Sequence, residues 1–336
     1  MQTTVDQLRD AALAAAIKAK ASALGFDLVG IAPADPSQYQ DYFRRWLDEG
    51  CHGDMTYLAN RFDVRVDPRR YLPEARSVIC VARNYHTHLE PVPEADRHRH
   101  GRVARYALGS DYHEHIKQLL YALADWIRQA VPGAQSRCSV DTAPVLEREM
   151  AARAGIGWVG KNTCVIHPVI GSYILLGQVV TSIDLPADEP QTDHCGTCTR
   201  CIDACPTQAI TAPYEMDPRR CISYLTIEYA GEIEPDLQRQ MGEWVLGCDI
   251  CQDVCPHNRQ PPEAIDPVLR PRLPTGTIDV ERASQWTLQE YHDATRHSAM
   301  RRVKLPQFQR NARIVLQNQQ RALGGKVASA VPSDAI

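Results

Sequence analysis

The chain has 336 residues, which corresponds to two or three domains at about 150 residues each. Apolar residues make up 44% and charged residues 23%, so the composition is that of a globular protein and excludes disorder throughout. The formal charge of −4 excludes a uniformly basic surface but permits a local basic patch. No apolar run reaches the ~18 residues of a membrane span. Residues 1–25 contain no cleavage site, so we expect a cytoplasmic protein with no membrane contact.

Helix-like and strand-like segments alternate over the first 185 residues. Helices are predicted at residues 5–24, 37–50, 113–131 and 144–155. Strands are predicted at residues 27–34, 77–82, 135–140, 164–168 and 172–180. This alternation predicts an α/β or α+β domain over residues 1–185. A polar stretch with prolines then leads to a cysteine-rich unit, residues 186–260, and a short helical, basic tail, residues 261–336.

Eight of the twelve cysteines fall between Cys195 and Cys255. Crowded cysteines in a large chain without a secretory signal are typically metal ligands. The first run is C-x2-C-x2-C-x3-C-P, the pattern of bacterial ferredoxins, in which the fourth thiolate binds a second cluster. The run consists of Cys195, Cys198, Cys201 and Cys205.

The second run is one cysteine short, because Val245 stands where its first cysteine would be. Cys221 is the remaining candidate for that place. Exchange of the fourth ligands then predicts two 4Fe–4S clusters. The predicted ligands of one are Cys195, Cys198, Cys201 and Cys255, and those of the other are Cys205, Cys221, Cys248 and Cys251.

Two structural zinc sites are the alternative interpretation, although zinc rarely uses a run of this length. The four scattered cysteines are expected to be ordinary buried thiols. These are Cys51, Cys80, Cys138 and Cys164.

Residues 155–162 read GIGWVGKN, which satisfies G-x-G-x-x-G and nearly satisfies the P-loop pattern. A P-loop needs a hydroxyl after its lysine, and Asn162 occupies that place. Both motifs also need a strand before and a helix after, whereas the pattern here predicts the reverse. We interpret the segment as a tight glycine turn and not as a nucleotide site.

Asp141 lies at the end of a predicted strand, before a helix that Pro144 would open. One interpretation is a carboxylate that caps the helix. The other is a general acid at the mouth of a pocket, which requires burial to raise the pKa of Asp141.

Several longer blocks resemble the epoxyqueuosine reductase family. They run from Asn60 to Val78 (NRFDVRVDPRRYLPEARSV), from Ala104 to His113 (ARYALGSDYH) and from Val140 to Cys164 (VDTAPVLEREMAARAGIGWVGKNTC), beside the two cysteine runs. The resemblance covers residues 8–320 and implies an N-terminal cobalamin-binding domain with a ferredoxin-like double-cluster domain. It also implies reduction of epoxyqueuosine to queuosine at the wobble position of GUN-anticodon tRNAs, those for aspartate, asparagine, histidine and tyrosine.

The resemblance further implies which residues serve the cofactors. Asp141 would be the proton donor and a cobalamin contact. The other expected cobalamin contacts are Arg61, Tyr106, Lys161, Asn162 and Ser223. Asp111 and His113 match the start of the D-x-H-x-x-G cobalt-binding motif, but Ile116 replaces its glycine. This agrees with a cobalamin bound base-off and without a histidine in place of its base.

tRNA and an external one-electron donor such as flavodoxin or ferredoxin are the expected partners of a monomer. The tail resembles the first of the HEAT-like repeats that longer relatives carry, and its basic residues are expected to contact tRNA. They are Arg296, Arg301, Arg302, Lys304, Arg310, Arg313, Arg321 and Lys326. A reductive dehalogenase-like or corrinoid-reducing enzyme and a non-catalytic electron carrier are the alternatives.

Overall fold

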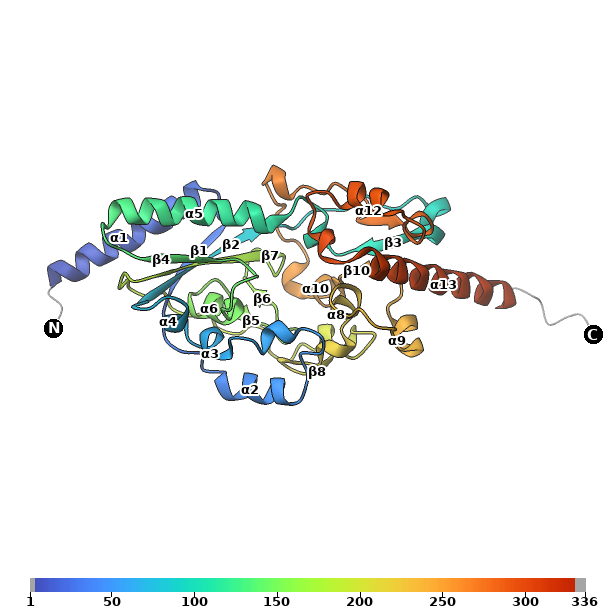
Figure 1. The fold of residues 1–336 in the computed structure, drawn as a ribbon, viewed down its shortest axis with the longest axis horizontal. Coiled ribbons are helices and arrows are strands. Elements are labelled where there is room, and N and C mark those ends of the chain that lie inside the picture. Colours follow the sequence, from blue (N-terminus) through green and yellow to red (C-terminus); the bar gives the residue numbers. More distant parts are fainter. Residues whose placement is uncertain (1–3, 330–336) are drawn as a thin grey trace, which may run out of the picture.

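A four-stranded antiparallel sheet forms the centre of the first half of the protein, in a computed structural model that describes residues 4–329 (Figure 1). Its strands, in spatial order, are β1 (Leu28–Pro33), β2 (Ser77–Asn84), β7 (Ile174–Thr181) and β4 (Ser136–Ser139). Strand β2 pairs with β7 over its whole length, from Ser77 opposite Thr181 to Asn84 opposite Ile174. The expected mixture of helices and strands is confirmed, and the antiparallel pairing makes this sheet the centre of an α+β arrangement.

Both faces of this sheet carry a hydrophobic core, because successive side chains of a strand point to opposite faces. The covering helices are α1 (Thr4–Ala23) and α5 (Tyr112–Ala130) on one face, and α4 (Pro68–Tyr71) and α6 (Glu147–Arg153) on the other (Figure 1). Ile79 of β2 belongs to the core with α5, whereas Cys80 belongs to the core with α6. The predicted strand 77–82 is apolar apart from Ser77 because both of its faces are covered.

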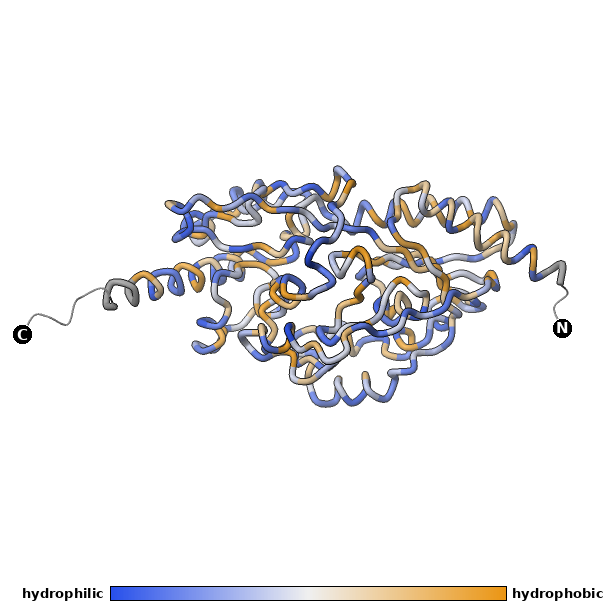
Figure 2. The backbone as a smooth tube through the Cα atoms, turned by 180° about the vertical axis from the view of Figure 1, so that it is seen from behind, coloured by the Kyte–Doolittle hydropathy of each residue, from blue (hydrophilic) through white to orange (hydrophobic). Residues whose placement is uncertain are grey.

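Short helices and turns connect these layers. Before and after β2 they are α2 (Gln40–Asp48), η1 (Thr56–Leu58), α3 (Phe62–Arg65), η2 (Glu94–Arg99) and η3 (Arg105–Ala107). Figure 2 shows α2, at the lower edge of the molecule, as mostly hydrophilic, whereas the strands of the sheet are mostly hydrophobic. The glycine turn 155–162 follows a helix and leads into the hairpin β5 (Trp158–Val159) and β6 (Val165–Ile166), which confirms that it lacks the strand-before-helix context of a nucleotide site.

The cysteine-rich unit consists of short elements. They are α7 (Arg200–Asp203), β8 (Ile210–Ala212), β9 (Glu215–Met216), η4 (Pro218–Arg220), α8 (Ile222–Ile227), α9 (Pro235–Gln240), β10 (Trp244–Leu246), α10 (Ile250–Asp253) and η5 (Pro256–Asn258). The C-terminal elements are η6 (Pro267–Leu269), β11 (Thr277–Asp279), α11 (Val280–Ala283), α12 (Leu288–Thr295), η7 (Ala299–Arg302) and α13 (Leu305–Ser329).

A second sheet joins the three predicted units. Its order is β10, β3 (His100–Val103) and β11, so each unit contributes one strand. Strand β3 pairs in parallel with β10 and antiparallel with β11. The segment 261–336 is therefore not purely helical, and the division into three units stays a prediction.

The helix predicted at residues 144–155 is shorter than expected, because α6 begins at Glu147. The Glu147 carboxylate turns back to accept hydrogen bonds from the Asp141 backbone N–H at 2.9 Å and from the Ser139 hydroxyl at 2.7 Å. Residues 141–146 are thus held as a loop, and Asp141 does not cap the helix. Among the described helices, none is long and apolar enough to cross a membrane.

Helix α13 is tied to the cysteine-rich unit by one buried amide. Asn311 is fully buried, and its Nδ2 donates to the carbonyls of Thr226 at 2.8 Å and Val245 at 3.0 Å. These two carbonyls belong to α8 and β10, which flank Cys221 and Cys248.

We therefore expect Asn311→Ala to lower the free energy of unfolding by about 1–3 kcal/mol, because it leaves buried carbonyls without donors. Chemical denaturation under anaerobic conditions measures this loss. Gln317→Ala, an exposed position on the same helix, is the matched control. Equal stability of the two variants would contradict the assigned role of Asn311.

Candidate functional site

The eight cysteines of the two runs gather into two groups. Cys255 interacts electrostatically with Cys195 and Cys198, and Cys201 interacts with Cys195 and Cys255. Cys221 and Cys248 interact with each other and with Cys205, and Cys251 interacts with both Cys221 and Cys248. The fourth cysteine of each run thus interacts with the other group, and the assignment of cluster ligands stays a prediction.

The surroundings of these thiols favour a cationic iron centre. Burial raises the pKa of Cys221 and of Cys248, so each thiolate needs a compensating positive charge. Backbone N–H groups supply part of it, from Ser223 and Tyr224 to Cys221 and from Ala209 to Cys205 at 3.2 Å. N–H groups aimed at sulfur are a regular feature of iron–sulfur sites. The donor set thus fits two clusters.

Cys164 is not an isolated buried thiol, in contrast to the expectation for the scattered cysteines. Its side chain shares a hydrogen bond with Cys251. The other scattered cysteines lie elsewhere, Cys80 inside the sheet and Cys51 after α2.

Lys161 and Asn162 hold the two cysteine loops. Lys161 Nζ donates to the carbonyls of Gly196 at 2.6 Å and Cys198 at 3.0 Å. Asn162 Nδ2 donates to the Cys251 carbonyl at 3.3 Å. The polar groups of both residues are thus occupied by the cysteine loops, and their contact with cobalamin stays a prediction.

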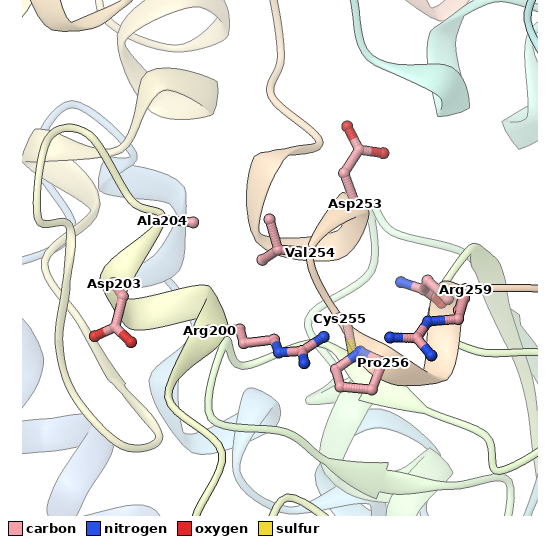
Figure 3. Close-up of a pocket in the computed structure, with 9 residues that line it drawn as sticks. Arg200, Asp203, Ala204, Asp253, Val254, Cys255, Pro256 and Arg259 are labelled. Atoms are coloured by element: carbon pink, nitrogen blue, oxygen red, sulfur yellow. The ribbon is translucent and has the colours of Figure 1, made fainter.

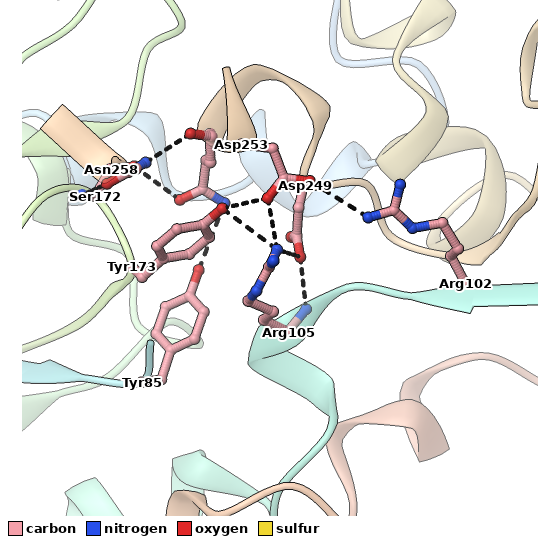
Figure 4. Close-up of polar contacts among 9 residues, drawn as sticks. Tyr85, Arg102, Arg105, Ser172, Tyr173, Asp249, Asp253 and Asn258 are labelled. Atoms are coloured by element: carbon pink, nitrogen blue, oxygen red, sulfur yellow. Dashed lines mark hydrogen bonds and ion pairs between the residues drawn. The ribbon is translucent and has the colours of Figure 1, made fainter. Parts of the chain in front are cut away.

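Arg105 connects the α+β sheet to helix α10, which lies between Cys248 and Cys255 (Figure 4). Its backbone N–H and Nη1 donate to the buried Asp249 carboxylate at 2.9 and 3.1 Å. Its Nη1 also lies 2.6 Å from Asp253 Oδ1, which accepts from the Tyr173 hydroxyl at 2.6 Å. Burial raises the pKa of Asp249 to about 6, and the Arg105 cation opposes this rise.

An open cavity of about 720 Å³ lies beside Cys255 (Figure 3). Arg200 and Arg259 extend from its two sides toward Cys255 and Pro256, and Asp203 and Asp253 lie at its rim. Asp141 does not line it. Of the first group of cysteines, Cys255 lines this cavity.

Asp141 is a surface carboxylate in a strained loop. Its φ of 54° lies in the left-handed region, and its side chain is 63% exposed. Asp141 Oδ2 lies 3.0 Å from His113 Nε2 and accepts from the Tyr112 hydroxyl at 3.4 Å. The carboxylate therefore contacts side chains at the start of α5 and not free N–H groups of a helix.

The charges around Asp141 differ from the sequence expectation. The hydrogen bond from His113 lowers the pKa of Asp141, whereas a general acid that holds its own proton requires a raised pKa. Burial opposes the charged form of His113, but hydrogen bonds to Asp111 and Asp141 raise its pKa to about 9. Burial raises the pKa of Glu147 to about 7.

Residues from five segments surround this carboxylate. Its electrostatic neighbours are Tyr57 of η1, Tyr106 of η3, Tyr112 and His113 of α5, Glu147 of α6 and Arg302 of η7. Of the expected cobalamin contacts, Tyr106 thus lies with Asp141.

Arg61 lies next to this group, whereas Ser223 lies with the second group of cysteines. Arg61 has a positive φ of 57° at the start of α3 and lies near Arg65. Arg65 Nε is buried without a partner among the described residues. Ser223 lies at the start of α8, beside Cys221. Aromatic rings, an orphaned donor and an exposed carboxylate fit an amide-rich, phosphate-bearing ligand such as cobalamin.

Sequence reasoning did not assign catalytic roles to His113, Glu147 or Tyr57. A usable signal existed for His113, because a carboxylate two residues earlier at a helix start typically binds the imidazole. Glu147 gave no signal, since its burial depends on the unexpectedly long loop before α6.

The basic residues of the tail have different surroundings. Arg301 and Lys304 are exposed, as are Arg296, Arg313 and Arg321. Arg302 forms an ion pair with Glu228 at 2.9 Å and lies over the Tyr57 ring.

Arg310 is not available to RNA, because its guanidinium donates to the carbonyls of Leu225, Tyr229 and Gly231. The side chain of Lys326 lies outside those described. The predicted tRNA surface must therefore omit Arg310.

Two family models match the chain. Residues 65–142 match the model described as "Epoxyqueuosine reductase QueG, DUF1730", and residues 194–258 match the "4Fe-4S double cluster binding domain". The second match identifies the cysteine-rich unit as iron–sulfur binding, in place of the zinc alternative. The first lies outside that unit, which an electron carrier alone would not explain.

Curated relatives and solved structures agree with these matches. An epoxyqueuosine reductase of Synechocystis sp. is 42% identical over 86% of this chain and 100% of its own length. One from Gloeobacter violaceus is 41% identical over 90% of this chain and 95% of its own length. The structure of an epoxyqueuosine reductase with an epoxyqueuosine-modified tRNA stem loop has a TM-score of 0.84 at 28% identity, covering 96% of this chain and 86% of that one.

We expect Cys221→Ala to lose about half of the roughly eight irons per chain that two 4Fe–4S clusters contain. The variant removes a ligand of one group only. Anaerobic iron and sulfide analysis measures the loss, with Cys138→Ala as the control that removes a thiol outside both groups. Full iron content in Cys221→Ala would remove this residue from the ligand set.

Proposed function

Because the chain belongs to the epoxyqueuosine reductase family, we propose that it reduces epoxyqueuosine to queuosine at the wobble position of GUN-anticodon tRNAs. The observation that carries this proposal is the placement of Arg105 and Tyr106 in one short turn. Arg105 holds the helix between Cys248 and Cys255, and the next residue lies beside Asp141. The proposed electron donors, the clusters, and the proposed proton donor, Asp141, are thus linked through two consecutive residues.

The reaction sets a clear demand on the site. The epoxide oxygen leaves as water and an alkene remains, so each turnover consumes two electrons and two protons. Bound 4Fe–4S clusters would supply single electrons, and a bound cobalamin would supply a strong nucleophile or reductant. The protein must hold these groups, admit the modified nucleoside and deliver protons to the oxygen.

The cofactor contacts follow from the donors described above. Cys195, Cys198, Cys201 and Cys255 would hold one cluster, and Cys205, Cys221, Cys248 and Cys251 the other. Tyr106 and Arg61 would contact cobalamin, with the unpartnered Arg65 Nε beside them as an additional donor. Lys161, Asn162 and Ser223, which also donate hydrogen bonds to the cysteine loops, would be further cobalamin contacts.

Asp141 is the proposed donor to the departing oxygen. Its carboxylate is exposed to an incoming substrate, whereas Glu147 behind it is buried and engaged by Ser139 and the Asp141 backbone. Arg302 and Tyr57 interact electrostatically with the same carboxylate. An external donor such as flavodoxin or ferredoxin would reach the first cluster from the open cavity beside Cys255, which Asp141 does not line.

Asp141→Asn is expected to reduce turnover about 10²–10⁴-fold, because the amide is nearly isosteric but cannot deliver a proton. Anaerobic single-turnover reduction of epoxyqueuosine in a tRNA stem loop measures this. Iron content should stay at the wild-type value. Asp184→Asn is the control, because it makes the same change at an exposed carboxylate that pairs with Arg76 and is not among the neighbours of Asp141. Turnover within a few-fold of wild type would exclude Asp141 as the donor.

tRNA is expected to contact the exposed basic residues of the tail. Changing Arg301 and Lys304 together to Ala should weaken tRNA binding and reduce the slope of log affinity against log salt by about two, since each lost phosphate contact removes about one. Arg302 is left intact because it lies beside Asp141. Arg128→Ala, an exposed arginine of α5, is the control. A wild-type slope in the double variant would place tRNA elsewhere.

A further inference from the structure

His113 is held by a carboxylate at each ring nitrogen. Asp111, the N-cap of α5, lies 2.7 Å from Nδ1 and also accepts the His113 backbone N–H at 3.0 Å. Asp141 Oδ2 lies 3.0 Å from Nε2. An ionised carboxylate can only accept hydrogen bonds, and a neutral imidazole has one N–H. Only the doubly protonated ring satisfies both contacts.

The carboxylates that face the pair also favour a positive His113. They are Asp111 before α5, Asp141 from the loop and Glu147 of helix α6. The other groups are Tyr57 of η1, Tyr106, Tyr112 and two cations, Arg302 of η7 beside Asp141 and Arg65 of α3 beside Tyr57 and Glu147. The Tyr112 ring stacks on His113 with centroids 4.0 Å apart. The hydrogen bonds to Asp111 and Asp141 raise the pKa of His113 to about 9. The hydrogen bond between His113 and Asp141 also lowers the pKa of Asp141.

We propose that His113 is a positioning residue that stores the proton which Asp141 delivers to the departing oxygen, an inference that rests on the proposed role of Asp141. In the resting pair the proton is on Nε2, and Asp141 is a carboxylate. Asp111 fixes the ring so that Nε2 points at Asp141 Oδ2.

The transfer is a simple proton relay with no change in oxidation state. The Nε2–H bond breaks and its electron pair stays on nitrogen, while a lone pair of Asp141 Oδ2 forms the new O–H bond. Asp141 then gives this proton to the epoxide oxygen. The imidazole, 27% exposed, takes another proton from solvent, and the relay can load Asp141 again for the second proton of the turnover.

This arrangement gives a distinct pH dependence. With His113 present, the imidazole stays doubly protonated below its pKa of about 9. Turnover should therefore be nearly constant from about pH 6 to 8 and fall above pH 9. Without His113, Asp141 must take its proton directly from water at a pH well above its own pKa. The rate should then fall about tenfold for each pH unit across the same range.

The test compares the pH profile of single-turnover reduction in the wild-type holoenzyme, His113→Gln and His115→Gln. His115 is a matched control, because it lies on the same helix and also contacts a carboxylate, Asp266 at 2.7 Å. We expect the steep profile only in His113→Gln, with its rate at pH 8 at least 10-fold below wild type. A profile parallel to wild type in His113→Gln would overturn the inference while leaving the proposed function intact.

A second measurement does not depend on turnover. In ¹⁵N-histidine-labelled protein, the resonance absent from His113→Gln should titrate near pH 9 in the wild type and at lower pH in Asp141→Asn. Titration of His113 at or below the ordinary value of about 6.5 would overturn the inference. If the wild-type holoenzyme leaves epoxyqueuosine unreduced, the proposed function fails, and the inference fails with it.

Discussion

The buried contact between Arg105 and Asp249 determines how the two halves of the site meet. Asp249 is 3% exposed, so its charge is stable only beside a cation, and the Arg105 side chain and backbone supply the donors. Asp249 follows Cys248 directly, and Tyr106 follows Arg105. A shift of this ion pair would therefore move a cluster ligand and a neighbour of Asp141 together. Loss of either partner would leave an uncompensated buried charge, which fixes the relative position of electron and proton supply.

The chemistry at Asp141 follows from an exposed carboxylate beside a clamped imidazole, and not from a carboxylic acid in an apolar pocket. In the pocket arrangement, desolvation would keep the proton on oxygen. Here the hydrogen bond between His113 and Asp141 raises the pKa of the imidazole and lowers that of the carboxylate, so in the proposed relay the proton would rest on nitrogen until Asp141 accepts it. The positive φ of Asp141 and the hydrogen bond from its backbone to Glu147 keep the side chain turned toward His113.

The sequence predicted the strands 77–82 and 172–180 well, because a strand covered on both faces is mostly apolar, although each of these also buries a polar residue, Ser77 and Gln178. The cysteine runs were equally informative, since thiol spacing directly reflects the size of a cluster. The predicted start of α6 was wrong, because Pro144 is compatible with a first helical turn. Only the tertiary contacts of Glu147 show that residues 141–146 form a loop. The sequence could not show that Arg310 is unable to contact RNA, since the carbonyls that engage its guanidinium lie about 80 residues away along the chain.

The parallel pairing of β3 with β10 has a consequence for how the protein is made. Residues 100–103 cannot complete their sheet until residues 244–246 and 277–279 have left the ribosome. Contacts of such large sequence separation form late and slowly. All eight cluster cysteines are therefore synthesised before the sheet that anchors their domain can close. A cluster inserted before residues 277–279 emerge would therefore occupy a unit whose anchoring sheet is still open.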